Sequence, residues 1–205
     1  MKITKIEIQK KDKHRYNIFI DGVFAFGLYE DSVLKYGLRT GDELNEEKIK
    51  EMREFDEFGY GKKTAYSFLA YKPRSKKDLV KKLKQKKLSD KIIEDIIELL
   101  EKQKYLDDKI YAKNYLEDKL NSKPIGKRLA KLKLFEKGID KELIETTINE
   151  NYSEDKEFEL AQKLMKKYEK KVKFKDMADK KNKCYRYLIS KGFDYEIAGR
   201  VLNIN

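Results

Sequence analysis

Basic side chains gather at three places along the chain, where their spacing would let them contact phosphate groups. Lysine and arginine donate charge-assisted hydrogen bonds to phosphate oxygens, and each such contact releases counterions condensed on a nucleic acid. For a single lysine, a solvated face that keeps the protein soluble is the ordinary explanation. The candidate contacts are Arg74, Lys76, Lys77, Lys81, Lys127, Arg128, Lys131, Lys183 and Arg186.

The sign of the charge alternates along the chain in these regions. The stretch 72–87 holds nine Lys or Arg and one acidic residue, whereas 90–108 holds three Lys and seven acidic residues. The alternation recurs, because 123–137 holds six basic residues and one acid, and 140–159 holds two basic residues and eight acids. We therefore expect a basic surface and an acidic surface on separate sides of the protein.

The sequence contains no arrangement of residues typical of an enzyme. The string GYGKKT at 59–64 resembles a phosphate-binding loop, but that motif needs glycine in place of Asp56 and Ser or Thr in place of Lys63. His14 falls in an expected turn without a neighbouring ligand pattern, which indicates a surface imidazole. We expect no catalytic residue, no metal site and no cofactor.

The composition indicates a soluble protein with an anionic partner. Of the 205 residues, 42% are charged, well above the roughly 25% of ordinary domains, and the formal net charge is +12. Nucleic acid is the leading candidate partner. The single cysteine excludes an intramolecular disulfide, and no apolar run is long enough to span a bilayer. We expect a cytoplasmic protein without a membrane partner.

The N-terminal region, residues 1–45, has the pattern of a small antiparallel sheet. Apolar and polar residues alternate from Ile3 to Ile8 and again from Tyr16 to Ile20. Asp21-Gly22 is a favoured hairpin dipeptide, and Val23 to Leu28 supplies a third apolar segment. These features predict a three-stranded meander.

Helical patterns follow the strands. Asn45 can cap a helix, and Gly59 and Gly61 are expected to interrupt it. A further helix is then expected to begin near Lys62 and to end ahead of Pro73.

Three segments of the remaining chain overlay without a gap. They begin at Lys76, Lys127 and Lys181 and run for about two helices each. The overlay brings into register the apolar residues Leu83, Leu134 and Leu188. Each segment also follows a helix that pairs a small residue with a large apolar one four positions later. A period near fifty residues predicts three tandem three-helix units, stacked into an elongated array.

The expected fold is mainly α, with tandem three-helix repeats preceded by the small β-rich region. We expect repeat 1 with its lead-in helix at 46–122, repeat 2 at 123–175 and repeat 3 at 176–205. The third repeat would share the helix at about 153–171.

The turn inside each repeat has a distinctive residue. Gly138 and Gly192 stand where a helix must stop, which suits the left-handed conformation at a helix C-terminus. Lys87 occupies that place in the first repeat, where a left-handed lysine costs roughly 1 kcal/mol. At the start of the same repeat, Ser75 followed by Asp78 resembles a capping box.

Two other residue types that could carry chemistry fit structural roles better. Cys184 falls on the packing position that Leu79 and Ala130 occupy in the overlay, which favours a buried small side chain over a nucleophile. Asp107-Asp108 stands before an apolar helix and fits an N-terminal cap better than a metal-binding pair.

The segments that carry these patterns resemble the RecX family, bacterial regulators of the RecA recombinase. The resemblance covers approximately Gly61 to the C-terminus, and the strand-rich head is similar to that of RecX proteins from low-GC Gram-positive bacteria. Lys87 departs from the family pattern, because glycine is missing there. The segments are YKPRSKKDLVKKL at 71–83, YLDDKIYAKNYL at 105–116, GKRLAKLKLFEKGI at 126–139 and SKGFDYEIAGRVL at 190–202.

This resemblance implies a monomeric protein that binds RecA filaments on single-stranded DNA and modulates, usually inhibits, recombinase, ATPase and coprotease activity. It makes the RecA filament and single-stranded DNA the expected partners, with double-stranded DNA as a further one. The net charge of +12 leaves a second hypothesis open, a stand-alone DNA-binding module without sequence preference. Loss of RecA ATPase only after the DNA is coated would favour the second hypothesis.

Overall fold

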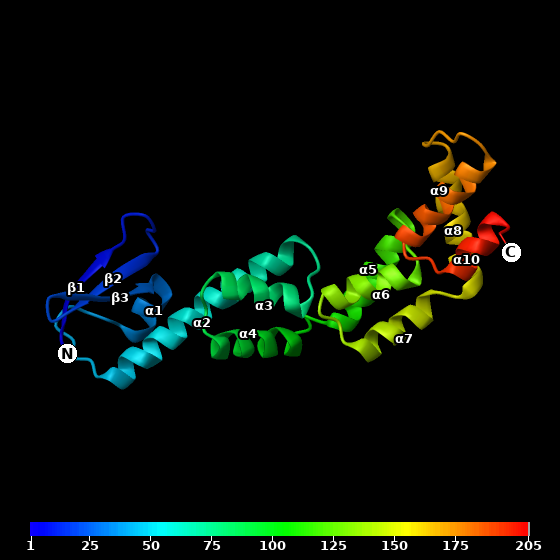
Figure 1. The fold of residues 1–205 in the computed structure, drawn as a ribbon. Coiled ribbons are helices and arrows are strands. Elements are labelled where there is room, and N and C mark those ends of the chain that lie inside the picture. Colours follow the sequence, from blue (N-terminus) through cyan, green and yellow to red (C-terminus); the bar gives the residue numbers. More distant parts are fainter. Residues whose placement is uncertain (205) are drawn as a thin grey trace. The chain divides into compact units, whose positions relative to one another are not determined.

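The computed structural model describes residues 1–204, which form two compact units. Unit 1 comprises residues 1–73 and 79–105, and unit 2 comprises residues 74–78 and the chain from 106 onward. Helix α3 (Lys76–Gln85) therefore begins in unit 2 and ends in unit 1. The elements are labelled in Figure 1.

Unit 1 opens with the predicted three-stranded antiparallel sheet. Strands β1 (Ile3–Ile8), β2 (Arg15–Ile20) and β3 (Val23–Tyr29) lie in the order β1-β2-β3, which leaves β3 at an edge. Asp21 and Gly22 both have positive φ, 50° and 85°, as a type I′ hairpin turn requires. The meander expected from the sequence is confirmed.

A short helix and a long one pack on this sheet. Helix α1 (Glu30–Tyr36) follows β3 directly, and helix α2 (Glu46–Tyr71) begins at the predicted cap, where Asn45 accepts a hydrogen bond from the Lys48 N–H at 2.8 Å. Met52 of α2 is fully buried in the core formed with the sheet. The buried Asp56 carboxylate accepts hydrogen bonds of 2.6 Å from the Tyr29 N–H and from the Ser32 hydroxyl, which fixes α2 to the end of β3.

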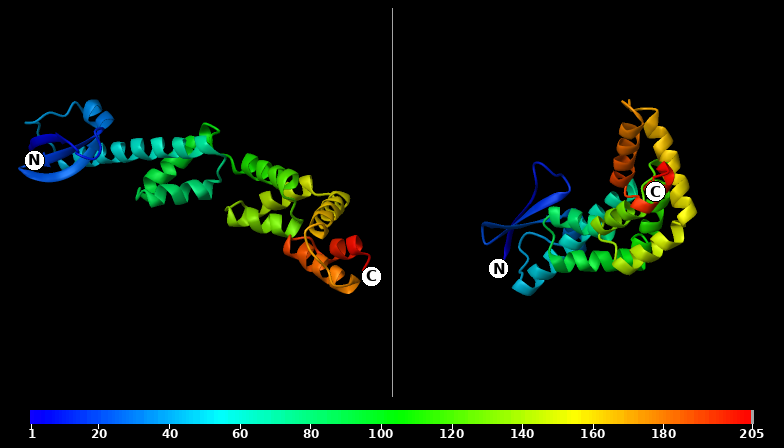
Figure 2. Two further views of the ribbon diagram at one scale, coloured as in Figure 1. Left: turned by 90° about the horizontal axis from the view of Figure 1, so that it is seen from above. Right: turned by 45° about the vertical axis from the view of Figure 1, so that its right-hand side comes forward.

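The predicted interruption of α2 at its glycines is wrong. The helix runs for 26 residues through Gly59 and Gly61 to Tyr71, as Figures 1 and 2 show. A side chain at Gly61 would collide with Ile96 and Leu88, so this glycine lets α4 pack closely on α2. Glycine costs about 1 kcal/mol inside a helix, and the burial of apolar side chains at this crossing offsets that cost.

The first repeat is completed by α3 and by α4 (Asp90–Lys102). The Asp78 N–H donates to the Ser75 hydroxyl at 3.2 Å, which confirms the predicted cap. Lys87 adopts the left-handed conformation at φ 61° without glycine. The apolar face of α4 is buried throughout and consists of Ile92, Ile93, Ile96, Ile97 and Leu100.

Unit 2 holds two further groups of three helices around one continuous core. The leucines in register in the overlay are fully buried, Leu83 in unit 1 and Leu134 and Leu188 in unit 2. The predicted cap of α5 is present, since Asp107 accepts hydrogen bonds from two N–H groups. The helices are α5 (Asp108–Ser122), α6 (Lys127–Glu136), α7 (Lys141–Asn151), α8 (Glu154–Glu169), α9 (Met177–Ser190) and α10 (Tyr195–Leu202).

Two glycines let the start of α6 touch the turn between α9 and α10. The Gly126 N–H donates to the Lys191 carbonyl at 2.8 Å, and the Arg128 N–H donates to the Gly192 carbonyl at 3.1 Å. A side chain on Gly126 would collide with the backbone of Gly192 and Phe193. Gly192 therefore has a second role besides its positive φ of 85°, because it admits a neighbouring backbone.

Candidate nucleic-acid interface

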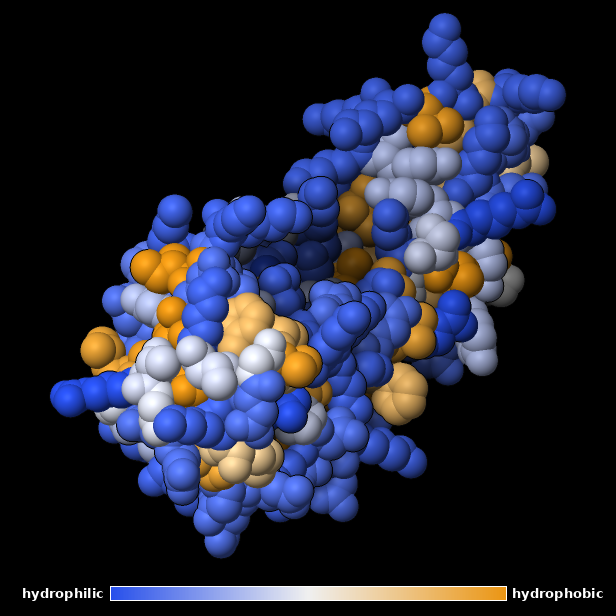
Figure 3. Space-filling model, turned by 90° about the vertical axis from the view of Figure 1, so that its left-hand side faces the viewer, coloured by the Kyte–Doolittle hydropathy of each residue, from blue (hydrophilic) through white to orange (hydrophobic). Residues whose placement is uncertain are grey.

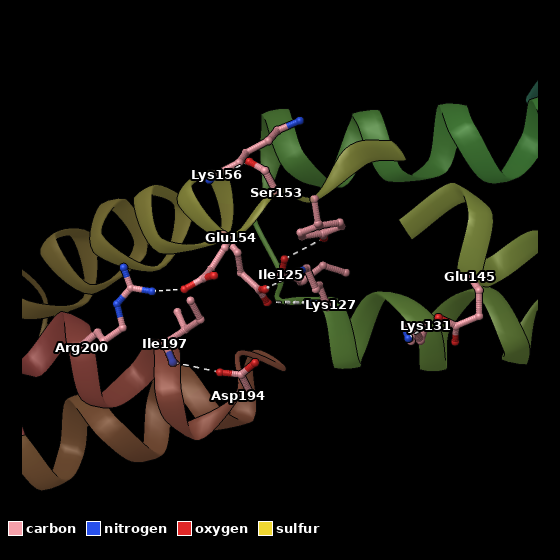
Figure 4. A network of polar contacts seen from close by, with 12 residues as sticks. Ile125, Lys127, Lys131, Glu145, Ser153, Glu154, Lys156, Asp194, Ile197 and Arg200 are labelled. Carbon is pink, nitrogen blue, oxygen red and sulfur yellow. Dashed lines mark hydrogen bonds and ion pairs between the residues drawn. The ribbon is translucent and has the colours of Figure 1, made fainter. Parts of the chain in front are cut away.

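Lys127 at the start of α6 is engaged with a buried acid. Its backbone N–H donates to Glu157 Oε1 at 2.9 Å, and its Nζ lies 3.4 Å from Glu157 Oε2. The Glu157 side chain is only 2% exposed, so the lysine compensates a carboxylate that would otherwise be buried without a counter-charge. Figure 4 shows Lys127 in this network of α6, α8 and α10. Lys127 therefore stabilises the fold, and a ligand would have to compete with Glu157 for its side chain.

Two more predicted contacts are also paired with acids. Lys131 Nζ lies 2.5 Å from Glu145 Oε2 of α7 (Figure 4), and Lys183 Nζ lies 2.8 Å from Asp179 Oδ2 in the preceding turn of α9. The hydrogen bond from Lys183, together with one from the Lys175 N–H, holds the pKa of Asp179 below its usual value. We call Lys127, Lys131 and Lys183 the paired lysines.

The expected separation of basic from acidic surfaces does not hold around these residues. Lys131 of the basic helix α6 meets Glu145 of the acidic helix α7, because the two helices pack against one another. Charge counts along the sequence could not reveal this pairing, since the partners come from different helices.

Four other predicted contacts are exposed and form no ion pair within residues 1–204. Lys77 and Lys81 lie one turn apart on α3, and Arg128 and Arg186 lie on α6 and α9. In the overlay of the repeats, Arg128 is equivalent to Lys77, and Arg186 is equivalent to Lys81. We call these four residues the recurrent cations.

The remaining two candidates, Arg74 and Lys76, lie where the segment 74–78 joins unit 2. Arg74 is half-buried, and the Lys76 N–H donates to Asp108 Oδ1 at 2.9 Å. The starts of α3 and α6 are thus similar, since each receives a carboxylate from the first helix of the following repeat. The structure brings Arg74, Lys76 and Lys77 together at this point.

Residues that could have indicated catalysis have structural or surface positions. His14 is exposed, with its Nδ1 3.3 Å from Glu30 Oε2. Cys184 is buried, as predicted, and burial raises the pKa of its thiol, which disfavours the reactive thiolate. The GYGKKT string lies inside α2 and forms no loop. Within residues 1–204 no cluster of three potential metal ligands occurs.

The tyrosines of unit 2 that lie near the core contribute to packing. Burial raises the pKa of Tyr111 to about 12, and the nearby Asp78 carboxylate adds to the effect. The buried Tyr152 hydroxyl donates to the Ile125 carbonyl at 2.9 Å. Neither ring is placed to stack on a base.

Sequence reasoning missed a second group of cations, in unit 1. Arg15, Arg53, Lys86 and Lys87 line an open groove between β3, α2 and the turn from α3 to α4. The unusual lysine at position 87 was the one indication in the sequence. Lys86 is adjacent to it in the sequence, whereas Arg15 and Arg53 come from distant parts of the chain.

Models of the regulatory protein RecX match four parts of the chain. The RecX N-terminal domain matches residues 1–45, and the first, second and third RecX three-helix domains match 62–100, 107–148 and 154–202. The chain belongs to the RecX family. Its fold is accordingly the predicted one, with three RecX three-helix domains after a small antiparallel sheet. The exact division at 46–122, 123–175 and 176–205 stays a prediction.

Curated RecX relatives match nearly the whole chain. "Regulatory protein RecX" of Clostridium beijerinckii is 36% identical over 205 residues, which covers 98% of this chain and 94% of the relative. The protein of the same name from Streptococcus agalactiae serotype Ia is 34% identical over 202 residues, which covers 98% of this chain and 76% of the relative.

Two solved structures are similar as well. A crystal structure of regulatory protein RecX aligns with a TM-score of 0.66 at 29% identity and covers 98% of both chains. A crystal structure of RecX from Lactobacillus salivarius aligns with a TM-score of 0.62 at 27% identity and covers 72% of this chain and 96% of that one.

Among the described residues of this RecX-family chain, no helix is long and apolar enough to cross a membrane.

Proposed function

We propose that this protein binds RecA filaments on single-stranded DNA and inhibits their recombinase, ATPase and coprotease activities. Membership of a family of regulatory proteins supports a regulatory role. The name RecX supports RecA as the partner. In this proposal the chain acts as a monomer in the cytoplasm, needs no cofactor and catalyses no reaction of its own.

The observation that carries the proposal is the recurrence of exposed cations at equivalent positions of different repeats. Lys77 and Arg128 share one repeat position, and Lys81 and Arg186 share another. Each position carries a cation in two of the three repeats, with Asn182 and Leu132 in the remaining places. A polymeric partner with regularly spaced acidic groups, whether phosphates or carboxylates, fits such a pattern.

Several weak contacts can together give firm binding. A single exposed ion pair contributes roughly 0–1 kcal/mol, too little to hold two proteins together. Contacts from linked repeats to one filament add through effective concentration, so the whole chain can bind far more tightly than any one repeat. This mechanism needs a filament with several sites rather than a lone RecA molecule.

The test is a titration of the protein into RecA ATPase on single-stranded DNA, at amounts well below those that coat the DNA. We expect strong suppression of ATP hydrolysis in this range, because bound filaments are blocked directly. Suppression only after the DNA is saturated would indicate competition for DNA, and would replace the proposal with a stand-alone DNA-binding module.

Variants can test whether the recurrent cations make the contact. The double variant Lys77→Glu and Arg128→Glu should need about tenfold more protein for half suppression, since two contacts become repulsive. The control Lys131→Gln removes a charge that Glu145 already neutralises and should change this amount less than about twofold. Equal effects of the two variants would refute the assignment, provided that both melt like the parent protein.

A further inference from the structure

Unit 1 contains an open groove of about 660 Å³ that no predicted site residue lines. Strand β3, helix α2 and the turn from α3 to α4 form its walls. Its volume falls within the roughly 300–1,000 Å³ typical of ligand-binding clefts. A groove of this size has room for a nucleotide or two, but its chemistry decides what it can bind.

The charged side chains of the groove leave positive charge uncompensated. Four cations and two carboxylates line the groove, so the formal charge of its lining is +2. Asp56 is held by hydrogen bonds from Tyr29 and Ser32, and Glu57 by the N–H of Ser89. Within residues 1–204, no ion pair is formed by the three residues that we call the groove cations, Arg53, Lys86 and Lys87. An anionic ligand would therefore meet cations that need not first break a protein contact.

Lys87 supports this interpretation because its backbone is strained. It adopts φ 61°, whereas the equivalent turns of the other two repeats use Gly138 and Gly192, for which positive φ carries little cost. The lysine side chain lines the groove. Lys104 has the same conformation away from the groove, so the strain supports a role for Lys87 only together with its place in the groove.

Aromatic rings accompany the cations. Phe24 lines the groove on the edge strand β3 and is 54% exposed, although its side chain is large and apolar. Tyr60 also lines it and stacks on Tyr29 with ring centroids 5.3 Å apart. Figure 3 looks onto this end of unit 1 and shows apolar side chains in patches surrounded by hydrophilic ones. Tyr60 and Tyr29 are half-buried, so Phe24 is the exposed ring of the three, and an exposed ring beside cations is the combination with which proteins bind unpaired bases.

We propose that this groove binds a single strand of nucleic acid, with the groove cations on its phosphates and Phe24 against a base. A duplex fits the arrangement poorly, because its bases are stacked on one another and cannot reach the ring. The inference does not rest on the proposed regulation of RecA, since the site needs only the chain and an oligonucleotide.

The decisive experiment compares two lysines with the same backbone strain. Lys104 also has positive φ, at 60°, in unit 1, but it lies outside the groove. Lys87→Gly and Lys104→Gly both remove one positive charge and both relieve a strained turn, so neither should melt below the parent. Binding of the full-length variants to a fluorescein-labelled oligothymidine is measured by anisotropy over a series of salt concentrations.

We expect only Lys87→Gly to weaken binding. The slope of log affinity against log salt should become shallower by about 0.7, the value for one lost phosphate contact on a single strand, and the affinity should fall severalfold. Lys104→Gly should keep the parent slope. Equal slopes for the two variants, or no binding of the oligonucleotide by the parent protein, would overturn the proposal.

A second comparison tests the aromatic contact and the strandedness. Phe24→Ala should lower the affinity about fivefold or more without changing the salt slope, because stacking releases no counterions. The neighbouring Val23→Ala is the control, since Val23 is 70% exposed but lies outside the groove. An unaltered affinity of Phe24→Ala, or equally tight binding of a duplex or a mononucleotide, would show that the groove responds to charge alone and would refute a single-strand site.

Discussion

The paired lysines of unit 2 and the groove cations of unit 1 carry the same kind of charge in different surroundings. Each paired lysine lies within 3.4 Å of a carboxylate oxygen, whereas no groove cation forms an ion pair within residues 1–204. A lysine with a carboxylate neighbour gains less from a phosphate, because the ligand must compete with an existing partner. The number of lysines in a stretch of sequence therefore does not measure how much positive charge the folded protein leaves available, because that depends on the carboxylates that packing brings near.

We expect the largest effect, a loss of folding stability, when the buried carboxylate partner of a paired lysine is removed. Glu157→Ala removes a buried acceptor from the Lys127 N–H and a counter-charge from its side chain. We expect the free energy of unfolding to fall by about 2 kcal/mol, as measured by denaturant unfolding followed by circular dichroism. The half-exposed pair of Lys131 with Glu145 provides the control, since Glu145→Ala should cost less than about 1 kcal/mol. Equal losses would mean that burial does not distinguish the two pairs.

The next largest effect should appear in the salt dependence of binding. It compares two double variants, one in each unit, that each lose two positive charges. Arg53→Gln with Lys86→Gln should reduce the salt slope of oligothymidine binding by about 1.4, the value for two phosphate contacts on a single strand. Lys131→Gln with Lys183→Gln removes the same net charge from unit 2 and should reduce the slope by less than about half of that. Titrations of both double variants at several salt concentrations measure the difference. A larger change for the unit 2 variant would reverse the comparison.

The smallest effect concerns pH and the start of α9. The pKa of Asp179 is lowered in the folded protein, so its stabilising contribution is complete above the ordinary value of 3.8 and is lost as the pH falls through the lower folded value. The protection of amide hydrogens in the first turn of α9, measured against the exchange rate of an unfolded chain at the same pH, should therefore fall in strongly acidic solution. Asp179→Asn should show reduced protection already at neutral pH, and its protection should not fall further in acid. A parent-like profile in the variant would exclude Asp179 as the cause.

Local patterns in the sequence predicted most of the fold. The caps at Asn45 and Asp107 and the left-handed turns at Gly138 and Gly192 depend on residues close in sequence, and all four are present. The prediction that α2 would break at Gly61 was wrong because the role of this glycine depends on a contact with α4, which is distant in the sequence. Local propensity predicted a break there, and tertiary packing overrides it.

The candidate site was less predictable for a related reason. The sequence shows which residues are basic, but an ion pair such as that of Lys131 with Glu145 depends on how two helices pack. The groove likewise combines β3, α2 and a turn that are separated along the chain. Only Lys87, which replaces a glycine of the repeat, gave an indication of it.

The continuity of α2 has a mechanical consequence. Its backbone hydrogen bonds run without a break from Met52, which is buried against the sheet, to Ala65, which is buried in the first repeat. At about 1.5 Å per residue, the helix is roughly 39 Å long. The sheet therefore cannot rotate about the helix axis unless the first repeat rotates with it. A molecule bound to one wall of the groove would transmit force to the sheet and to the first repeat together.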